Sequence, residues 1–265
     1  MQSFLRNEQE FDILFTVPHK GIRKIIGAGA HGECSVKRIR KILSALVPRH
    51  GVFPLILAVT LNFSVYYGTR IIAGDWHHYN IESSWDKMIP LWSPSVVIYF
   101  GCYLFWIVNY IIIARQDKTS VCQFFSADFI SRIVCMVFYL AFPTTNTRPQ
   151  IAAEGFWNQA MLMLYETDAA DNLFPSIHCL VSWFCYIGLR GRKNISAGYK
   201  AASCIMAILV CVSTLTTKQH VLIDVAGGIF LAEICVYIGK RPKVWGTYEK
   251  LLDKVNKKIF GKEGN

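Results

Sequence analysis

Apolar residues gather along this chain in six long blocks that polar segments separate. The blocks are apolar on all sides rather than along one stripe, which is typical of segments surrounded by lipid, although several are shorter than the ~20 residues of a usual span. In lipid the backbone must satisfy its own hydrogen bonds, and no block alternates as barrel strands do, so we expect helices. The expected spans are 52–72, 96–114, 121–142, 174–189, 199–212 and 221–238. The pattern predicts an all-α, polytopic membrane protein built on a six-transmembrane-helix bundle.

Two basic segments flank the six blocks. Within residues 1–51, apolar positions recur at helical spacing opposite a run of Lys and Arg. This predicts an amphipathic helix, either lying on an anionic leaflet or packed on the membrane domain as a solvated helix. A second basic amphipathic helix is expected over 245–260, where it would serve as a surface anchor. We therefore divide the chain into an N-terminal segment (1–51), a six-helix membrane domain (52–239) and a tail (240–265).

The composition agrees with a membrane protein, since 53% of the residues are hydrophobic and 17% are charged, whereas about a quarter are charged in soluble domains. The net charge of +10 comes largely from Lys and Arg outside the blocks, nine in residues 1–51 and eight in 240–262. This distribution follows the positive-inside rule rather than the basic, aromatic surface of a nucleic-acid binder. Both termini should therefore be cytoplasmic, and no nucleic-acid partner is expected.

Nine cysteines are present, most of them inside apolar blocks, without a CxxC pair or a His/Cys metal spacing. We interpret them as packing residues and expect no disulfide framework, no metal and no cofactor. One charged pair falls inside the third block. Asp128 and Arg132 are four residues apart there, and we predict a structural ion pair between them.

The segment between the fifth and sixth blocks carries candidate chemistry and reads STLTTKQHVLIDVAGG over 213–228. His220 and Asp224 are four residues apart, so in a helix they share one face. An acidic group placed there can hold one imidazole nitrogen and leave the other basic. Lys218 adds a cation at the same place. Together, a base, an orienting acid and a cation suit attack on a phosphate.

Two further segments carry candidate residues for a phosphate site. Arg148, before a proline, is a candidate phosphate ligand because its guanidinium can bind two oxygens; lipid-headgroup contact is the alternative. The sequence PSIH at 175–178 opens the fourth block as a helix start. Its free N–H groups and the Ser176 hydroxyl can bind an anion, and His178 can protonate a leaving group; a capping serine beside an interfacial histidine is the alternative. All three patches face the outer side in the predicted topology.

In order and spacing, these patches resemble the type 2 phosphatidic acid phosphatase superfamily, whose pattern is KxxxxxxRP, PSGH and SRxxxxxHxxxD. The resemblance covers roughly residues 90–228 and implies a six-helix core, a site on the outer face, a phosphohistidine intermediate and no metal. It implies His220 as nucleophile, Asp224 as its orienting acid and His178 as general acid and base. The phosphate ligands that it implies are Arg148, Lys218, Ser176, Ser213 and Thr214.

The chain departs from that pattern at three positions. The lysine of the first motif falls at Ala141, the arginine of the third at Thr214, and the glycine of PSGH at Ile177. The forms FPSIH and TKQH look closer to the branch that contains inositol phosphorylceramide synthase and many bacterial proteins. We therefore favour a bacterial plasma membrane over a eukaryotic internal one.

The resemblance predicts an integral membrane enzyme that hydrolyses a phosphomonoester or diphosphate of a lipid, such as phosphatidate, phosphatidylglycerol phosphate or an isoprenyl diphosphate. Two alternatives stay open: head-group transfer to a lipid alcohol, and a transporter or scaffold that keeps the helices without the chemistry. Asp168 and Asn172 are expected to shape a loop in the outward segment 143–174. The expected partner is the lipid-phosphate substrate, and the sequence is silent on the oligomeric state.

Overall fold

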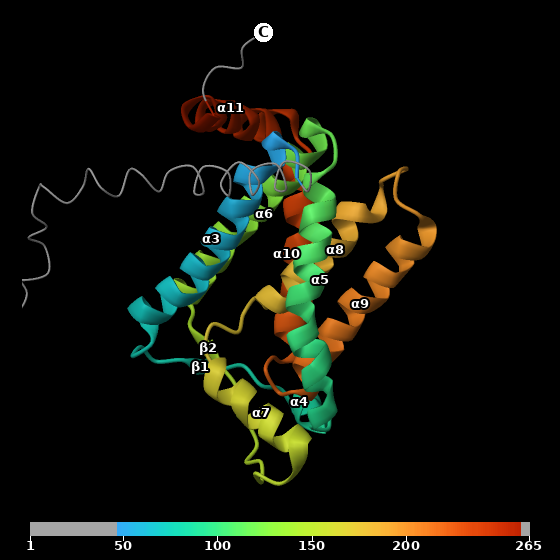
Figure 1. Cartoon of the computed structure of the whole chain (residues 1–265). Coiled ribbons are helices and arrows are strands. Elements are labelled where there is room, and N and C mark those ends of the chain that lie inside the picture. The colour runs from blue at the N-terminus through green and yellow to red at the C-terminus, as the bar shows by residue number, and fades with distance from the viewer. Residues whose placement is uncertain (1–46, 261–265) are drawn as a thin grey trace, which may run out of the picture. The chain divides into compact units, whose positions relative to one another are not determined.

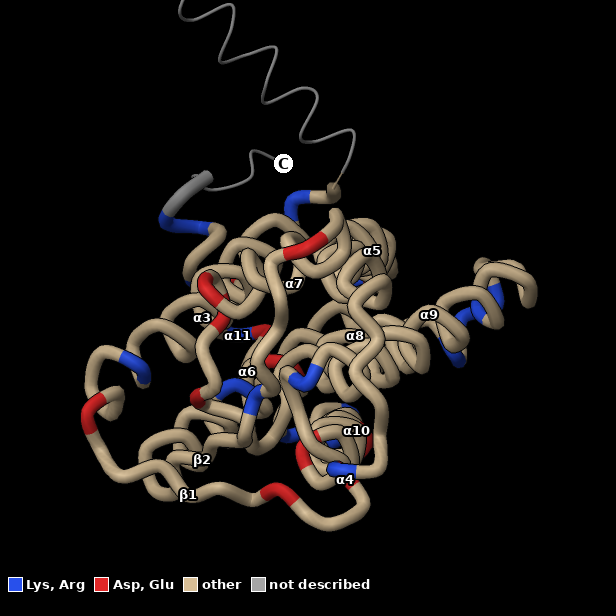
Figure 2. The backbone as a smooth tube through the Cα atoms, turned by 90° about the horizontal axis from the view of Figure 1, so that it is seen from below, with Lys and Arg blue, Asp and Glu red and all other residues tan. Residues whose placement is uncertain are grey.

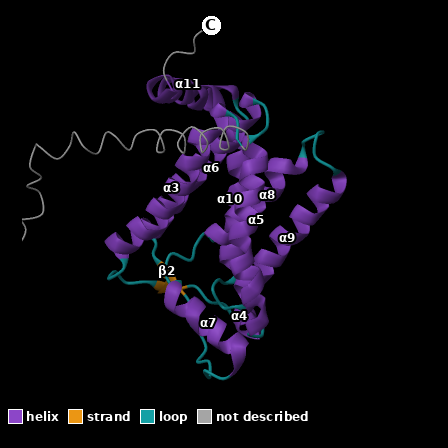
Figure 3. Cartoon of the chain, in the orientation of Figure 1, coloured by secondary structure: helices purple, strands orange, loops and turns teal. Residues whose placement is uncertain are grey.

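The computed structural model describes residues 47–260. These residues form helices joined by short connections, together with one two-stranded sheet (Figures 1 and 3). In chain order the elements are α3 (Arg49–Ala73), β1 (Tyr79–Asn80), α4 (Ser84–Met88), the 3-10 turn η2 (Ser93–Ser95), α5 (Val96–Ala114), α6 (Lys118–Ala141), β2 (Thr144–Thr145), α7 (Gly155–Thr167), α8 (Ile177–Arg190), α9 (Ala197–Thr216), α10 (Leu222–Gly239) and α11 (Pro242–Phe260).

Five of the described helices are long and apolar enough to cross a membrane, namely α3, α5, α6, α9 and α10. Each coincides with a predicted block, and α5 has the predicted bounds. The fourth block forms α8, which has 14 residues. Such a helix is about 21 Å long, less than the ~30 Å hydrocarbon core. The all-α, polytopic membrane architecture is confirmed, whereas the count of six spans stays a prediction.

Helix α8 lies at the centre of the packing. Eleven of its 14 residues are buried, and it packs against α5, α9 and α10, while α6 packs against α3 and α10.

A buried ion pair lies within α6, where Arg132 Nη2 donates to Asp128 Oδ1 at 2.9 Å. The hydroxyl of Tyr110, from α5, donates to the same oxygen at 2.7 Å. Charges buried this deeply need such partners. The predicted ion pair is confirmed.

The connections at one end of the helices contain more structure than the sequence pattern predicts (Figure 1). Residues 143–174 include α7, whose Met161 and Leu164 pack with Val96 and Tyr99 of α5. The pattern does not reveal this helix, because Glu154 at its start makes no side-chain cap and its apolar run is short. The strands β1 and β2 pair in parallel and join the connection after α3 to the one after α6. Viewed from this end, both acidic and basic positions lie along the connections (Figure 2).

The predicted tail helix is present as α11, which packs against α3 and α6. Tyr248 and Leu252 are buried, whereas Leu251 is exposed. Lys118 at the start of α6 pairs with Asp253 at 2.7 Å and with Glu249 at 3.1 Å. The amphipathic helix expected before residue 47 lies outside the described residues, and the surface-anchor role of the tail stays a prediction.

Candidate active site

The chain turns sharply between α9 and α10 and places His220 at the turn. The carbonyl of Thr214 accepts from the N–H groups of both Gln219 and His220, each at 3.0 Å. His220 thus precedes α10, and Asp224 lies in the first turn of that helix. Oδ2 of Asp224 is 3.3 Å from His220 Nδ1 and accepts from the Val221 N–H at 2.9 Å. Because a carboxylate can only accept, Nδ1 carries a proton and Nε2 is left free to react.

The electrostatics of this pair favour a charged imidazole. Burial lowers the pKa of His220, but the hydrogen bond and the charge of Asp224 outweigh it and raise the pKa above its ordinary value. Asp224 is itself fully buried. Its carboxylate is therefore placed to stabilise the cation that forms if His220 attacks an electrophile.

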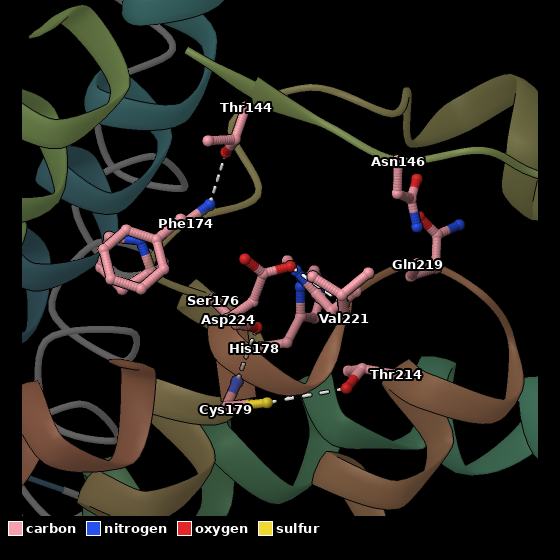
Figure 4. Close-up of polar contacts among 12 residues, drawn as sticks. Thr144, Asn146, Phe174, Ser176, His178, Cys179, Thr214, Gln219, Val221 and Asp224 are labelled. Atoms are coloured by element: carbon pink, nitrogen blue, oxygen red, sulfur yellow. Dashed lines mark hydrogen bonds and ion pairs between the residues drawn. The ribbon is translucent and has the colours of Figure 1, made fainter. Parts of the chain in front are cut away.

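The start of α8 lies against the start of α10. Ser176 is the N-cap of α8, the role given above as the alternative to an anion ligand: its Oγ accepts from the Cys179 N–H at 3.3 Å, and its own N–H donates to the carbonyl of Asp224 at 3.1 Å. Figure 4 shows Ser176, His178 and Asp224 together where the two helices meet. The imidazole centroids of His178 and His220 are 5.8 Å apart. The structure therefore brings the two predicted histidines to one place.

Aromatic side chains of α5 surround His178. The Tyr99 hydroxyl is 3.3 Å from His178 Nδ1, and the ring centroids of these two residues are 4.5 Å apart. The Trp106 ring lies 5.5 Å from the imidazole. Nε2 of His178 is buried and has no hydrogen-bond partner among the described residues. This nitrogen is the atom of the side chain left for a substrate.

Arg148 follows β2 and is held by contacts within the protein. Nη1 donates to the carbonyl of Asp168 at 2.7 Å, Nη2 donates to Gln219 Oε1, and the guanidinium lies 4.7 Å from the centroid of the Tyr165 ring. Nε is buried without a partner in the described part of the chain. Burial lowers the pKa of Arg148, although a guanidinium stays protonated at physiological pH. The Arg148 guanidinium is thus bound by Asp168 and Gln219.

The Lys218 side chain is bound by the segment that contains α4. The backbone of Lys218 adopts the left-handed conformation with φ 56°, and its Nζ donates to the carbonyls of Asp86 at 2.8 Å and Ile89 at 2.5 Å. The carboxylate of Asp86 accepts from the Leu222 N–H at 2.7 Å and so caps α10 from α4. Lys218 therefore joins the histidine turn to α4 rather than contributing a free cation.

The hydroxyls of Ser213 and Thr214 are engaged within α9. Ser213 donates to the carbonyl of Val210, and Thr214 donates to that of Cys211, each at 2.7 Å. The Thr214 oxygen also lies 3.6 Å from Cys179 Sγ (Figure 4). The contact with Cys179 ties α9 to the start of α8, and both predicted phosphate ligands are buried.

A cavity of about 260 Å³ lies beside the two histidines. Of the eight predicted site residues, His178 and His220 line it, together with Asp168, Asn172 and Gln219. Seven aromatic side chains also line it, namely Phe63, Tyr66, Tyr67, Phe100, Tyr103, Trp106 and Tyr139. The loop role expected for Asn172 agrees with its contact, since Nδ2 donates to the carbonyl of Tyr66 at 3.3 Å.

An apolar groove adjoins the cavity. It has a volume of about 390 Å³ and is lined by α3, α5, α6 and α8. Four residues line both spaces, namely Asn62, Phe63, Tyr103 and Trp106. The groove therefore continues from the histidine cavity along the helices that are expected to lie in lipid.

Within residues 47–260, no group of three His, Cys, Asp or Glu side chains is arranged to hold a metal ion. The fold and the neighbouring histidines define a polytopic helical membrane protein with a histidine-lined cavity between its helices. A model of the PAP2 superfamily matches residues 85–238, more than half of the chain and all three motifs. No curated protein and no solved structure gives a significant match. The chain belongs to the PAP2 superfamily, the superfamily of type 2 phosphatidic acid phosphatases, and this membership supports a phosphatase-type activity on lipid phosphates.

Proposed function

We propose that the protein hydrolyses a phosphomonoester or diphosphate of a lipid through a phosphohistidine intermediate. The observation that carries the proposal is the pair of histidines on one cavity, with imidazole centroids 5.8 Å apart and Asp224 behind His220. This arrangement supplies a nucleophile with a fixed tautomer and a second imidazole for proton transfer.

In the first half-reaction, Nε2 of His220 attacks phosphorus. A P–N bond forms as the P–O bond to the lipid breaks, and Nε2 of a protonated His178 gives its proton to the leaving oxygen. In the second half-reaction, neutral His178 takes a proton from water, the resulting hydroxide attacks phosphorus, and the P–N bond breaks to release phosphate. Asp224 stabilises the imidazolium that exists between the two steps.

The groove beside the cavity supports a lipid substrate. A phosphate next to the histidines would leave its hydrocarbon chain facing the shared wall at Phe63, Tyr103 and Trp106. Burying that chain in the groove is favourable at about 25 cal/mol per Å² of apolar surface. We infer that the substrate enters laterally from the membrane on the outer face of the bilayer.

Head-group transfer, as in an inositol phosphorylceramide synthase-like branch, is the second candidate, and the small number of free cations favours it. Ala141 and Thr214 stand where the superfamily pattern has Lys and Arg, and Lys218 is occupied by the carbonyls of Asp86 and Ile89. A phosphodiester carries one negative charge and needs less compensation than a phosphomonoester dianion. In that case a lipid hydroxyl replaces water in the second half-reaction.

The decisive experiment measures phosphate release by the purified protein in detergent from phosphatidate, phosphatidylglycerol phosphate and an isoprenyl diphosphate. His220→Ala should abolish release, whereas His77→Ala, in the exposed segment before β1, should retain it. Transfer of a labelled head group to diacylglycerol or ceramide, without phosphate release, would identify a transferase. A folded protein that is silent in both assays would overturn the enzymatic proposal in favour of a transporter or scaffold.

A further inference from the structure

Asp168, at the end of α7, is held by two tyrosines from different helices. Its Oδ1 accepts from the Tyr66 hydroxyl of α3, and its Oδ2 accepts from the Tyr99 hydroxyl of α5. The backbone carbonyl of the same residue accepts from Arg148. Asp168 therefore has three fixed partners at the cavity wall, more than a residue that only shapes a loop requires.

The Tyr99 hydroxyl connects this carboxylate to His178. A phenol has one proton, and Tyr99 gives it to Asp168, so its oxygen can only accept from a second partner. That second partner is His178 Nδ1, at 3.3 Å. The geometry thus requires the proton of the neutral imidazole to be on Nδ1.

We propose that Asp168, acting through Tyr99, is a positioning residue that fixes the tautomer and orientation of His178. The neutral ring then carries its proton on Nδ1 and presents the lone pair of Nε2 to the cavity. This nitrogen is buried and has no partner among the described residues, as expected for an atom that meets a substrate. The role of His178 in proton transfer rests on the proposed function, whereas the assignment of its Nδ1–H tautomer does not.

The charge of Asp168 suits this role. Burial raises the pKa of Asp168, but the charge of His178 and the hydrogen bonds from Tyr66 and Tyr99 outweigh burial, and the pKa lies below its ordinary value. The carboxylate is therefore ionised at neutral pH. Its charge favours the protonated form of His178, which the proton transfer to the leaving group requires, whereas burial and the charge of His220 favour the neutral form.

The two histidines of the cavity are then held in the same manner. Asp224 contacts Nδ1 of His220 directly, and Asp168 reaches Nδ1 of His178 through one hydroxyl. Each imidazole is left with Nε2 as its reactive nitrogen. Each histidine thus has its own acid that sets its tautomer: Asp224, inside the third superfamily motif, for His220, and Asp168, outside the motifs, for His178.

The first test is the tautomer of His178, measured by two-bond 15N–1H correlations on protein with 15N-labelled histidine at alkaline pH, with His178→Gln for assignment. We expect the Nδ1–H form in the wild type and its loss in Tyr99→Phe and Asp168→Asn. Tyr186→Phe, the same Tyr-to-Phe change on the helix that carries His178, is the matched control and should leave the Nδ1–H form in place. An Nε2–H form in the wild type, or an unchanged spectrum in folded Tyr99→Phe, overturns the proposal.

The second test is kinetic, on the substrate that the wild type turns over. Tyr99→Phe should lower kcat by at least about tenfold, part of the factor of about 10²–10⁴ that general acid–base catalysis supplies, and change KM by less than about twofold. A wild type with the Nδ1–H tautomer but without turnover would refute the proposed function and leave the positioning role standing. Turnover with an unchanged kcat in Tyr99→Phe would refute the positioning role alone.

Discussion

The main-chain N–H of Ser176 donates to the main-chain carbonyl of Asp224 at 3.1 Å, so the helix starts that carry the two histidines are bonded to each other. Gly228, one turn further along α10, makes this approach possible. A Cβ at that position would lie 2.6 Å from the Ser176 oxygen and 3.1 Å from the Leu180 nitrogen. Because both neighbours are backbone atoms, they cannot yield as a flexible side chain would.

Gly228→Ala should therefore push α8 away from α10 and lower both stability and turnover. Overpacking of this kind costs about 1–3 kcal/mol. The measurement is the thermal unfolding midpoint in detergent together with kcat. Gly198→Ala in α9 is the matched control, since a Cβ there meets nothing within 4 Å. Equal behaviour of the two variants would contradict the account of the helix contact.

Arg148→Lys should raise KM and lower kcat, although the charge is kept. A lysine cannot reproduce the two separate bonds to the Asp168 carbonyl and Gln219, and it leaves no Nε–H for a phosphate oxygen. Arg190→Lys is the control, because Arg190 also makes a two-pronged contact, with Glu233 at 2.9 and 3.0 Å, at the far end of α8. If KM and kcat of Arg148→Lys match those of the wild type, Arg148 does not contribute to the site.

The sequence motifs predict which of their side chains meet in the folded chain where the spacing carries local geometry. His220 and Asp224 meet through a four-residue separation, and Ser176 caps α8 where the PSIH segment indicates a helix start. The direction of a single side chain is not encoded in this way. Lys218 lies inside the motif, but its left-handed backbone turns the ammonium toward α4.

The residues that the sequence pattern does not reveal act through contacts between distant segments. Tyr66 and Asp168 are 102 positions apart, and Asp86 and Leu222 are 136 apart. No helical periodicity or short motif links the members of either pair, and tyrosines in apolar blocks usually indicate packing. One signal is present in the sequence, since Asp168 is an acidic residue in a segment that the predicted topology places on the outer side. Its partners become visible only when α3, α5 and α7 are placed in space.

Asp86→Ala should destabilise the protein and slow turnover together. The carboxylate caps α10 through the Leu222 N–H at 2.7 Å and accepts from the Ser83 N–H of its own helix at 2.8 Å. Loss of a cap costs about 1 kcal/mol. Thermal unfolding and kcat are the measurements, with Asp75→Ala in an exposed connection as the control. An unfolding midpoint no lower than that of Asp75→Ala would show that Asp86 does not hold α10.

The same capping contact should weaken in acid. Burial raises the pKa of Asp86, but the hydrogen bonds from Ser83 and Leu222 outweigh it and hold the pKa below its ordinary value. A carboxyl group with a lowered folded-state pKa stabilises the protein above its unfolded pKa of about 3.9 and loses that contribution as the pH falls through the folded value. The stability difference between wild type and Asp86→Ala should therefore shrink below pH ~4. A difference that stays constant with pH would contradict the contact.

The pH dependence of turnover should report the state of His220. Attack requires the neutral imidazole, and Asp224 raises the pKa of His220 above its ordinary value against the effect of burial. The limb of the kcat/KM profile that His220 controls should therefore have its midpoint above about 6.5, and loss of the proton that His178 must donate adds a second, descending limb. Asp224→Asn removes the charge that favours the imidazolium, so the midpoint should move to lower pH while the maximal rate falls. The profile of log kcat/KM against pH for both proteins is the measurement. A midpoint that is the same in wild type and Asp224→Asn would show that His220 is not the group whose deprotonation starts the reaction.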